Sequence, residues 1–321
     1  MFNRYQYLFY DERGNMKNYS KLHLTGFNDK KFMISGCNGY LGSELVKQLE
    51  ANLIHYVGID KNSTNKNSGH IFNLTENKEV DKIITKNNPD YFIHTATHSA
   101  IAYKNNFLES FLEDTISLVN ILSILKKENS KAKLVYFSSS YVYSSNSKNT
   151  ELVNEESAIN PAHNFGIAKA FFEQMIMREY KNSIIFRLSS VFGKGNSLHP
   201  NAIKGMAEQA IKSDLISIWG SGKRRMQYVY LEDVIKSTFA SLEISGGIYN
   251  LSSNDYVTVR ETADKIAKFF NTDIELLENK IEGETLPPLD NSKLVKSLNS
   301  DLISNFDKTL DFYLNDIKVN I

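Results

Sequence analysis

The segment Ser35-Gly36-Cys37-Asn38-Gly39-Tyr40-Leu41-Gly42 decides the fold, because it joins a short apolar run to an amphipathic stretch. The apolar run at 32–34 suits a buried parallel strand. Apolar residues then recur at 41, 45, 46 and 49, on one face of a helix. Glycines between a strand and a helix let the backbone turn tightly and approach a pyrophosphate at the helix N-terminus. The segment therefore predicts a dinucleotide-binding turn.

Strand and helix patterns alternate after this turn. Further strands are expected at 56–60, 91–93, 133–137 and 183–187, and helices at 76–88, 106–128 and 161–181. The pattern loosens after residue 192, with helices expected at 201–213 and 258–270. This order predicts an α/β fold, a Rossmann-type doubly wound parallel sheet with a smaller C-terminal α/β substrate lobe. The expected domains are an N-terminal extension at 1–30, an NAD-binding Rossmann domain at 31–192, and a lobe at 193–321 that is mainly substrate-binding and interleaved with the Rossmann domain.

Composition excludes several classes of partner. Among the 321 residues, Lys+Arg and Asp+Glu both total 37, so no global charge recruits nucleic acid or an anionic membrane. The single cysteine, Cys37, excludes an intrachain disulfide and a thiolate zinc cluster. No segment approaches the ~20 apolar residues of a membrane span, and no His, Asp and Glu spacing indicates a metal site. Without a secretory h-region at the N-terminus, the protein is expected in the cytoplasm.

Asp60 indicates which dinucleotide the turn would bind. It ends the second expected strand, where a carboxylate accepts hydrogen bonds from an adenosine ribose and repels a 2′-phosphate. NAD is therefore the expected cofactor, although the neighbouring Lys61 weakens the preference over NADP.

Further motifs follow the turn in a fixed order. They are Pro89-Asp90-Tyr91-Phe92-Ile93-His94-Thr95-Ala96, Phe137-Ser138-Ser139-Ser140-Tyr141-Val142-Tyr143, Phe165-Gly166-Ile167-Ala168-Lys169, Gly220-Ser221-Gly222-Lys223-Arg224-Arg225 and Tyr228-Val229-Tyr230-Leu231-Glu232-Asp233-Val234. Over roughly residues 31–270, this ordered set resembles the extended short-chain dehydrogenase/reductase family, in its nucleotide-sugar epimerase/dehydratase branch.

The resemblance implies roles for individual residues. Ser139 stands where the family places a catalytic Ser or Thr, and Lys169 is similar to the lysine that holds the nicotinamide ribose. That lysine also lowers the pKa of a catalytic tyrosine four residues earlier, where this chain has Phe165. The expected cofactor-binding residues are Gly36, Asn38, Gly39, Tyr40, Leu41, Gly42, Asp60, Asn73, Leu74, Thr95, Ala96 and Lys169.

Phe165 is the main departure from the family pattern. Phenylalanine keeps the ring and lacks the titratable hydroxyl, and loss of a positioned acid–base group costs ~10²–10⁴-fold in rate. Three interpretations stay open. The chain is a Tyr→Phe variant made to trap substrate, a natural enzyme with another acid–base residue (Tyr141 first, then His98 or His163), or a natural non-catalytic binder.

Tyr141 also narrows the reaction class. Sugar 4,6-dehydratases of this family carry a carboxylate at that position, so the resemblance disfavours a typical dehydratase. The leading expectation is an NAD-dependent C4 epimerase of nucleotide-sugars in polysaccharide or glycan assembly, impaired as written. A 4-ketoreductase or 4-oxidase is the alternative, and a non-catalytic NAD-binding regulator is the alternative from another class.

The expectation of a nucleotide-sugar substrate depends on an arginine. A nucleoside diphosphate calls for a planar multi-donor head, and Arg225 matches the family's pyrophosphate arginine. Ser190 stands where the family often has a substrate-contacting asparagine. The expected substrate-binding residues are His98, Ser139, Ser140, Ser190 and Arg225. By family analogy, the helices at 106–128 and 161–181 are expected to form a four-helix bundle in a homodimer.

Overall fold

A parallel sheet forms the centre of the protein in this computed structural model, which describes residues 22–62, 69–128, 130–143, 151–195 and 201–319. Its seven strands have the order β10-β6-β5-β4-β1-β2-β3. Their bounds are β1 (Phe32–Ser35), β2 (Tyr56–Asp60), β3 (His70–Ile71), β4 (Tyr91–His94), β5 (Lys133–Ser139), β6 (Ser183–Leu188) and β10 (Gly247–Leu251). All of them pair in parallel, so their carboxyl ends share one edge of the sheet.

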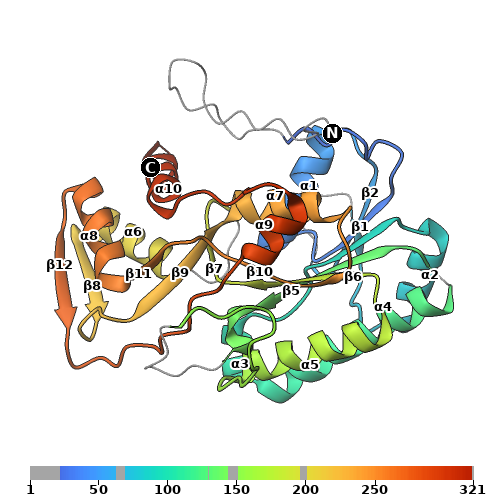
Figure 1. Ribbon diagram of the computed structural model, residues 1–321, viewed down its shortest axis with the longest axis horizontal. Helices are drawn as coiled ribbons and strands as arrows, with labels where there is room; N and C mark the ends of the chain where they lie inside the picture. The colour runs from blue at the N-terminus through green and yellow to red at the C-terminus, as the bar shows by residue number, and fades with distance from the viewer. Residues whose placement is uncertain (1–21, 63–68, 129, 144–150, 196–200, 320–321) are drawn as a thin grey trace.

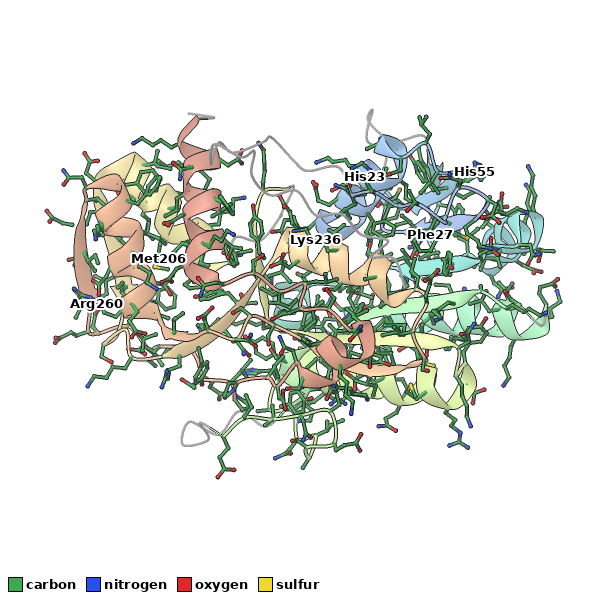
Figure 2. All side chains as sticks on the ribbon, turned by 45° about the horizontal axis from the view of Figure 1, so that its top comes forward. His23, Phe27, His55, Met206, Lys236 and Arg260 are labelled. Carbon is green, nitrogen blue, oxygen red and sulfur yellow. The ribbon has the colours of Figure 1, made fainter. Side chains whose placement is uncertain are left out.

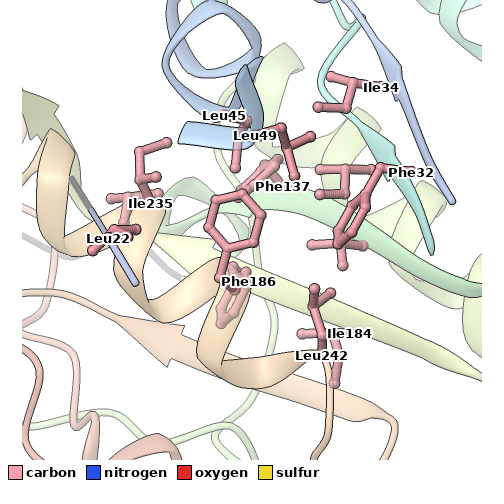
Figure 3. Packing of buried hydrophobic residues seen from close by; sticks show 14 of the residues in the cluster. Leu22, Phe32, Ile34, Leu45, Leu49, Phe137, Ile184, Phe186, Ile235 and Leu242 are labelled. Carbon is pink, nitrogen blue, oxygen red and sulfur yellow. The ribbon is translucent and has the colours of Figure 1, made fainter. Parts of the chain in front are cut away.

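Helices cover both faces of this sheet (Figure 1). One face packs against α1 (Tyr40–Ala51), α7 (Leu231–Ser241) and α9 (Ser292–Leu298), and the other against α2 (Asn77–Asn87), α4 (Phe107–Lys127) and α5 (Asn164–Glu179). Strand side chains alternate between the faces. We call the core under α1, α7 and α9 the first core, and the core under α2, α4 and α5 the second core. Phe32 and Ile34 enter the first core (Figure 3), whereas Met33 enters the second. This alternation explains why the strands are apolar throughout.

The smaller lobe has its own core. Helices α6 (Ala202–Ser213), α8 (Val259–Phe270) and α10 (Phe306–Val319) pack there with strands of two small sheets. The sheets are β7 (Ser190–Phe192), β9 (Arg225–Tyr230) and β11 (Tyr256–Thr258), and β8 (Leu215–Trp219) with β12 (Asp273–Leu277). Met206 and Arg260 of the lobe lie at the opposite end of the molecule from Phe27 and His55 (Figure 2).

The predicted fold class is confirmed, with differences in detail. The sequence pattern predicts no strand at 247–251, within the expected lobe, yet β10 extends the central sheet beside β6. A short helix, α3 (Ala100–Asn105), precedes the expected long helix. Of the expected N-terminal extension, residues 1–21 lie outside the described part of the chain. Leu22, Leu24 and Phe27 are buried in the first core.

Among the described residues, no helix is both long and apolar enough to cross a bilayer.

Candidate cofactor and substrate sites

The glycine turn leaves no room for side chains where the backbone approaches itself. Gly36 has a φ of +74°, and a Cβ there would lie 2.7 Å from the Ala96 amide nitrogen. A Cβ on Gly42 would lie 2.1 Å from the Gly36 carbonyl oxygen. Helix α1 begins after Gly39 without a side-chain cap, so its first amides are available to an anion. This cradle therefore fits the pyrophosphate of a dinucleotide.

A cleft of about 700 Å³ extends from this turn along the carboxyl ends of the strands. The predicted residues Gly36, Gly39, Asp60, Asn73, Leu74, Thr95 and Ala96 all line it, together with Thr97, His98, Glu113 and Asp114. We name it the cofactor cleft. The other predicted turn residues, Asn38, Tyr40, Leu41 and Gly42, are not part of its wall. The Tyr40 hydroxyl instead donates a hydrogen bond to the Gly193 carbonyl at 3.1 Å, and Leu41 packs against the first core.

The Asp60 carboxylate is held in place at one end of the cofactor cleft. Its Oδ2 accepts a hydrogen bond from the Asn38 amide at 3.0 Å, and its Oδ1 accepts one from the Asn62 amide at 2.9 Å. Two backbone donors fix its orientation and leave further acceptor positions on both oxygens.

A second cleft, of about 500 Å³, lies where β5 ends and the lobe begins. Its wall includes the predicted residues Ser139, Ser140, Tyr141, Ser190 and Arg225. We name it the substrate cleft. The Arg225 guanidinium lies 4.5 Å from the centre of the Tyr256 ring, and its Nη2 donates a hydrogen bond to the Tyr256 carbonyl at 2.7 Å. His98, expected among the substrate residues, instead lines the cofactor cleft.

Lys169 connects the walls of the two clefts. Its Nζ donates hydrogen bonds to Thr97 Oγ1 at 3.0 Å, the Tyr136 hydroxyl at 3.1 Å and the Phe137 carbonyl at 2.9 Å. Thr97 lines the cofactor cleft, while Phe137 lies on the strand that ends at Ser139 of the substrate cleft. Burial lowers the pKa of Lys169 to about 8, against the opposing charges of Asp114 and Glu173.

Residues 32–252 match the sequence model of the NAD dependent epimerase/dehydratase family. This chain belongs to that family. The dTDP-4-dehydro-6-deoxyglucose reductase of Escherichia coli is 25% identical over 259 residues, which cover 73% of this chain and 80% of the reductase.

Solved structures share the fold of this epimerase/dehydratase family member. The UDP-glucose 4-epimerase of Thermotoga maritima, solved with UDP-glucose, has a TM-score of 0.80 at 18% identity, covering 90% of this chain and 99% of that one. The UDP-glucose 4-epimerase of Thermus thermophilus, in complex with NAD, has a TM-score of 0.79 at 18% identity, covering 91% and 100%.

Phe165 of this family member lies beside Lys169 and next to Tyr141 of the substrate cleft wall. The centre of its ring is 5.4 Å from Lys169 Nζ, and its ring packs edge-on against the rings of Tyr103 and Tyr141, with centroids 5.7 and 6.1 Å away. The Tyr141 ring also packs against His163 at 5.1 Å. Within the described residues, the Tyr141 hydroxyl has no hydrogen-bond partner that could activate it.

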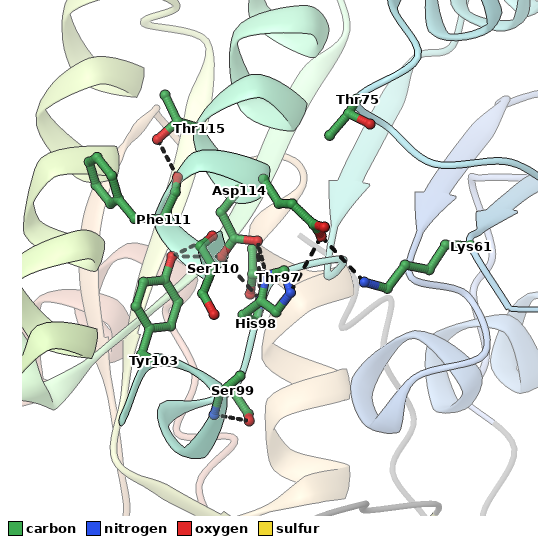
Figure 4. A network of polar contacts seen from close by, with 12 residues as sticks. Lys61, Thr75, Thr97, His98, Ser99, Tyr103, Ser110, Phe111, Asp114 and Thr115 are labelled. Atoms are coloured by element: carbon green, nitrogen blue, oxygen red, sulfur yellow. Dashed lines mark hydrogen bonds and ion pairs between the residues drawn. The ribbon is translucent and has the colours of Figure 1, made fainter. Parts of the chain in front are cut away.

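Sequence reasoning missed a chain of charged and polar groups along the cofactor cleft (Figure 4). Lys61 pairs with Glu113 at 3.4 Å, and Glu113 lies 3.5 Å from His98 Nε2. His98 Nδ1 lies 2.7 Å from Asp114 Oδ1, and the Tyr103 hydroxyl donates to Asp114 Oδ2 at 2.8 Å. The available signal was Asp114 itself, a carboxylate four residues after Ser110 and therefore on the same face of the helix.

No group of three His, Cys, Asp or Glu side chains that could hold a metal occurs in the part of the chain that the structure describes.

Proposed function

We propose that this family member binds NAD and alters the sugar of a nucleoside-diphosphate sugar by hydride transfer at a carbinol, most directly as a C4 epimerase. The observation that carries this proposal is the position of Lys169, whose ammonium bonds to a wall residue of the cofactor cleft and to the strand leading into the substrate cleft. A reacting carbon between the two clefts would be next to both cofactor and substrate groups.

Bound NAD would supply the hydride acceptor. The glycine turn and the first amides of α1 would hold its pyrophosphate, and Asp60 would accept hydrogen bonds from its adenosine ribose. The Lys169 ammonium would exchange one of its three present hydrogen bonds for one to the second ribose. On the substrate side, the Ser139 hydroxyl would bond the carbinol oxygen, and Arg225 would pair with the diphosphate.

A 4-ketoreductase is the second candidate from the same substrate class. The Escherichia coli reductase supports this candidate, because this chain matches 80% of the length of that enzyme. Asp60 favours the epimerase, because a carboxylate beside the adenosine ribose disfavours NADP. A 4-oxidase would use the same two clefts with a different fate for the reduced cofactor.

Phe165 favours a candidate of another class, a non-catalytic NAD-binding regulator. The ring fills the space beside Lys169 without a hydroxyl, so binding could persist without turnover. Arg225 argues against this candidate, because a regulator that senses only NAD needs no diphosphate-binding arginine.

A panel of UDP-, dTDP-, GDP- and CDP-sugars separates these candidates. Thermal unfolding is measured with NAD alone and with NAD plus each sugar, since a ligand that binds the native state raises Tm. A further rise with one nucleotide class supports the enzyme proposal. Stabilisation by NAD with no addition from any sugar supports the regulator. Mass spectrometry of the products then distinguishes an epimer from a reduced or oxidised sugar.

We further propose a homodimer formed through α4 and α5. The apolar residues of these helices divide into two sets, since Phe107 and Phe111 pack inward against the second core. An outward set remains exposed at helical spacing: Leu108, Leu112, Ile116, Val119, Ile167 and Phe171. Such a contiguous apolar stripe is typical of a protein interface.

A further inference from the structure

The end of the cofactor cleft that holds Asp60 also carries a lysine. Lys61 follows Asp60 directly and lines the same wall, together with Asn62. Asn38 fixes this turn, because its Nδ2 donates a hydrogen bond to the Asn62 carbonyl at 2.8 Å and its backbone amide donates to Asp60 at 3.0 Å. The turn therefore holds a carboxylate and the base of a lysine side chain at fixed places beside the expected adenosine ribose.

The ammonium of Lys61 meets a carboxylate from another element of the cleft wall. Its Nζ lies 3.4 Å from Oε2 of Glu113, which belongs to α4 and also lines the cofactor cleft (Figure 4). His98 Nε2 lies 3.5 Å from the same Glu113 oxygen. Glu113 Oε2 is thus the atom at which the lysine and the histidine converge, and the lysine is directed toward α4.

The charges of this cleft disfavour a further anion. Among the described residues of its wall, Lys61 is the only lysine or arginine, whereas Asp60, Glu113 and Asp114 are carboxylates. Asp114 pairs with His98 at 2.7 Å and Glu113 pairs with Lys61. This leaves Asp60 without a cationic partner among the described residues. The 2′-phosphate of NADP, with a charge of about −1.5 to −2 at pH 7, would therefore meet a carboxylate and an ammonium that is already paired.

The pair of Lys61 and Glu113 lies at the surface, which makes it easy to alter. The two side chains are 53% and 34% exposed, and exposed ion pairs contribute little to stability. Removing one partner should therefore leave the fold intact and change only the charge that a ligand meets. A 2′-phosphate that reached Lys61 would have to displace Glu113, whose own charge would remain in the cleft and repel it.

We infer that Glu113 keeps the cofactor cleft selective for NAD by occupying Lys61, which would otherwise be the cationic partner of a 2′-phosphate. The cleft thus contains a latent NADP site, suppressed by a carboxylate on α4 in addition to the repulsion from Asp60. This assignment explains how a lysine can follow Asp60 without favouring NADP. The inference rests on the proposed function for its dinucleotide and is independent of the sugar.

The first test compares the binding of NAD and NADP to the intact protein without any sugar. Isothermal titration calorimetry measures both Kd values for the wild type and for Glu113→Gln, which keeps the shape of the side chain and removes its charge. The variant is expected to lower the ratio of the NADP Kd to the NAD Kd about tenfold, with the NAD Kd changed less than about threefold, because Lys61 then bonds to the 2′-phosphate. An unchanged ratio would overturn the inference.

Glu109→Gln is the matched control for this change. It removes the same charge one turn earlier on α4, and Glu109 is not part of the cleft wall. Its ratio of Kd values should equal that of the wild type. A ratio that falls as far as in Glu113→Gln would mean that any carboxylate on α4 opposes NADP, and the specific role of Glu113 would be wrong.

A second pair of variants decides whether the effect depends on Lys61. Lys61→Met keeps most of the apolar stem and removes the ammonium. The gain in NADP binding from Glu113→Gln should disappear when it is made in the Lys61→Met background, since two residues in contact couple in their effects. An equal gain in both backgrounds would overturn the inference, because Glu113 would then act only by its own repulsion.

Phosphorus NMR tests where the 2′-phosphate lies. At saturating NADP, the 2′-phosphate bound to Glu113→Gln should keep its second negative charge to lower pH than the one bound to Glu113→Gln with Lys61→Met, because a neighbouring ammonium favours the charged form. Coinciding titration curves would place the phosphate away from Lys61 and would contradict the inference.

These measurements separate failure of the inference from failure of the proposed function. If neither dinucleotide binds the wild-type protein, the proposed cofactor is wrong and the inference falls with it. If NAD binds and Glu113→Gln leaves the ratio of Kd values unchanged, the inference alone is wrong and the proposed NAD site stands.

Discussion

The Nζ of Lys169 lies 5.4 Å from the centre of the Phe165 ring, which carries no hydroxyl that could accept a hydrogen bond from this ammonium. The ammonium instead bonds to Thr97, Tyr136 and Phe137. A phenol at position 165 would stand next to a cation that favours the phenolate.

Phe165→Tyr is expected to raise the rate of hydride transfer, by ~10²–10⁴-fold if no other residue does this work. The rate is followed by the absorbance of NADH or by product analysis with the nucleotide-sugar that binds in the thermal screen. Phe165→Leu is the control and gives no gain. A tyrosine variant that is no faster than the parent, although wild-type turnover is substantial, would mean that the acid–base group lies elsewhere.

Arg225→Ala is expected to weaken nucleotide-sugar binding about ten- to a hundredfold, because a hydrogen bond to a charged group contributes roughly 1.5–3 kcal/mol. Isothermal titration calorimetry in the presence of NAD measures the affinity. Arg260→Ala is the matched control, since Arg260 pairs with Asp264 of its own helix at 2.9 Å. Unchanged affinity in Arg225→Ala would remove Arg225 from the substrate site.

Asp60→Asn is expected to narrow the preference for NAD over NADP. The amide retains an acceptor for the Asn38 amide and no longer repels a 2′-phosphate. Fluorescence titration with both dinucleotides measures the ratio of Kd values. Asp81→Asn on α2, away from the cleft wall, should leave the ratio as it is. If Asp60→Asn binds NADP no better relative to NAD, the carboxylate does not face the ribose.

Leu112→Glu is expected to convert a dimer into monomers. Leu112 is 60% exposed on α4, within the apolar stripe, and a buried unpaired charge in an interface is strongly unfavourable. Light scattering after size-exclusion chromatography gives the mass. Leu152→Glu is the control, because Leu152 has a similar exposure of 62% and lies outside α4 and α5. A wild-type protein that runs as a monomer would refute the proposed interface.

The pair of His98 and Asp114 is expected to make stability depend on pH. The folded pKa of His98 is raised, so its contribution is full below the ordinary value of 6.5 and is lost as pH rises through the folded value. The free energy of unfolding in urea should therefore exceed that of His98→Asn by more at pH 6 than at pH 9. His55→Asn should show no such difference. A gap that grows as pH rises would contradict a raised pKa of His98 in the folded protein.

Much of the fold follows from local pattern. Residues 56–60 form β2 as predicted. The expected helix at 76–88 differs from α2 by one residue at each end, and the one at 258–270 differs from α8 by one residue at its start. β10 could not be found this way, because its Gly-containing sequence becomes a strand only through pairing with β6. Non-local pairing decides such segments, and periodicity does not report it.

The residues of the candidate site also divide into those that local sequence could place and those that depend on tertiary contacts. Residues in the glycine turn and at strand ends could be placed from sequence, because parallel strands bring their carboxyl ends to one edge. Asp114 could not, since its role depends on α4 carrying it to His98, sixteen residues earlier in the chain. Arg225 lines the substrate cleft, but its stacking on Tyr256 depends on the pairing of β9 with β11.

The late strand β10 also bears on how the chain is made. Gly247–Leu251 complete the sheet edge beside β6, and the lobe helix α6 lies between the two strands in sequence. During synthesis, β6 therefore emerges from the ribosome with an unpaired edge and keeps it until β10 follows. An open edge of Ile184, Ile185 and Phe186 is a template for pairing with another chain. Chains that stop short of β10 should accordingly aggregate rather than remain as a folded dinucleotide-binding domain.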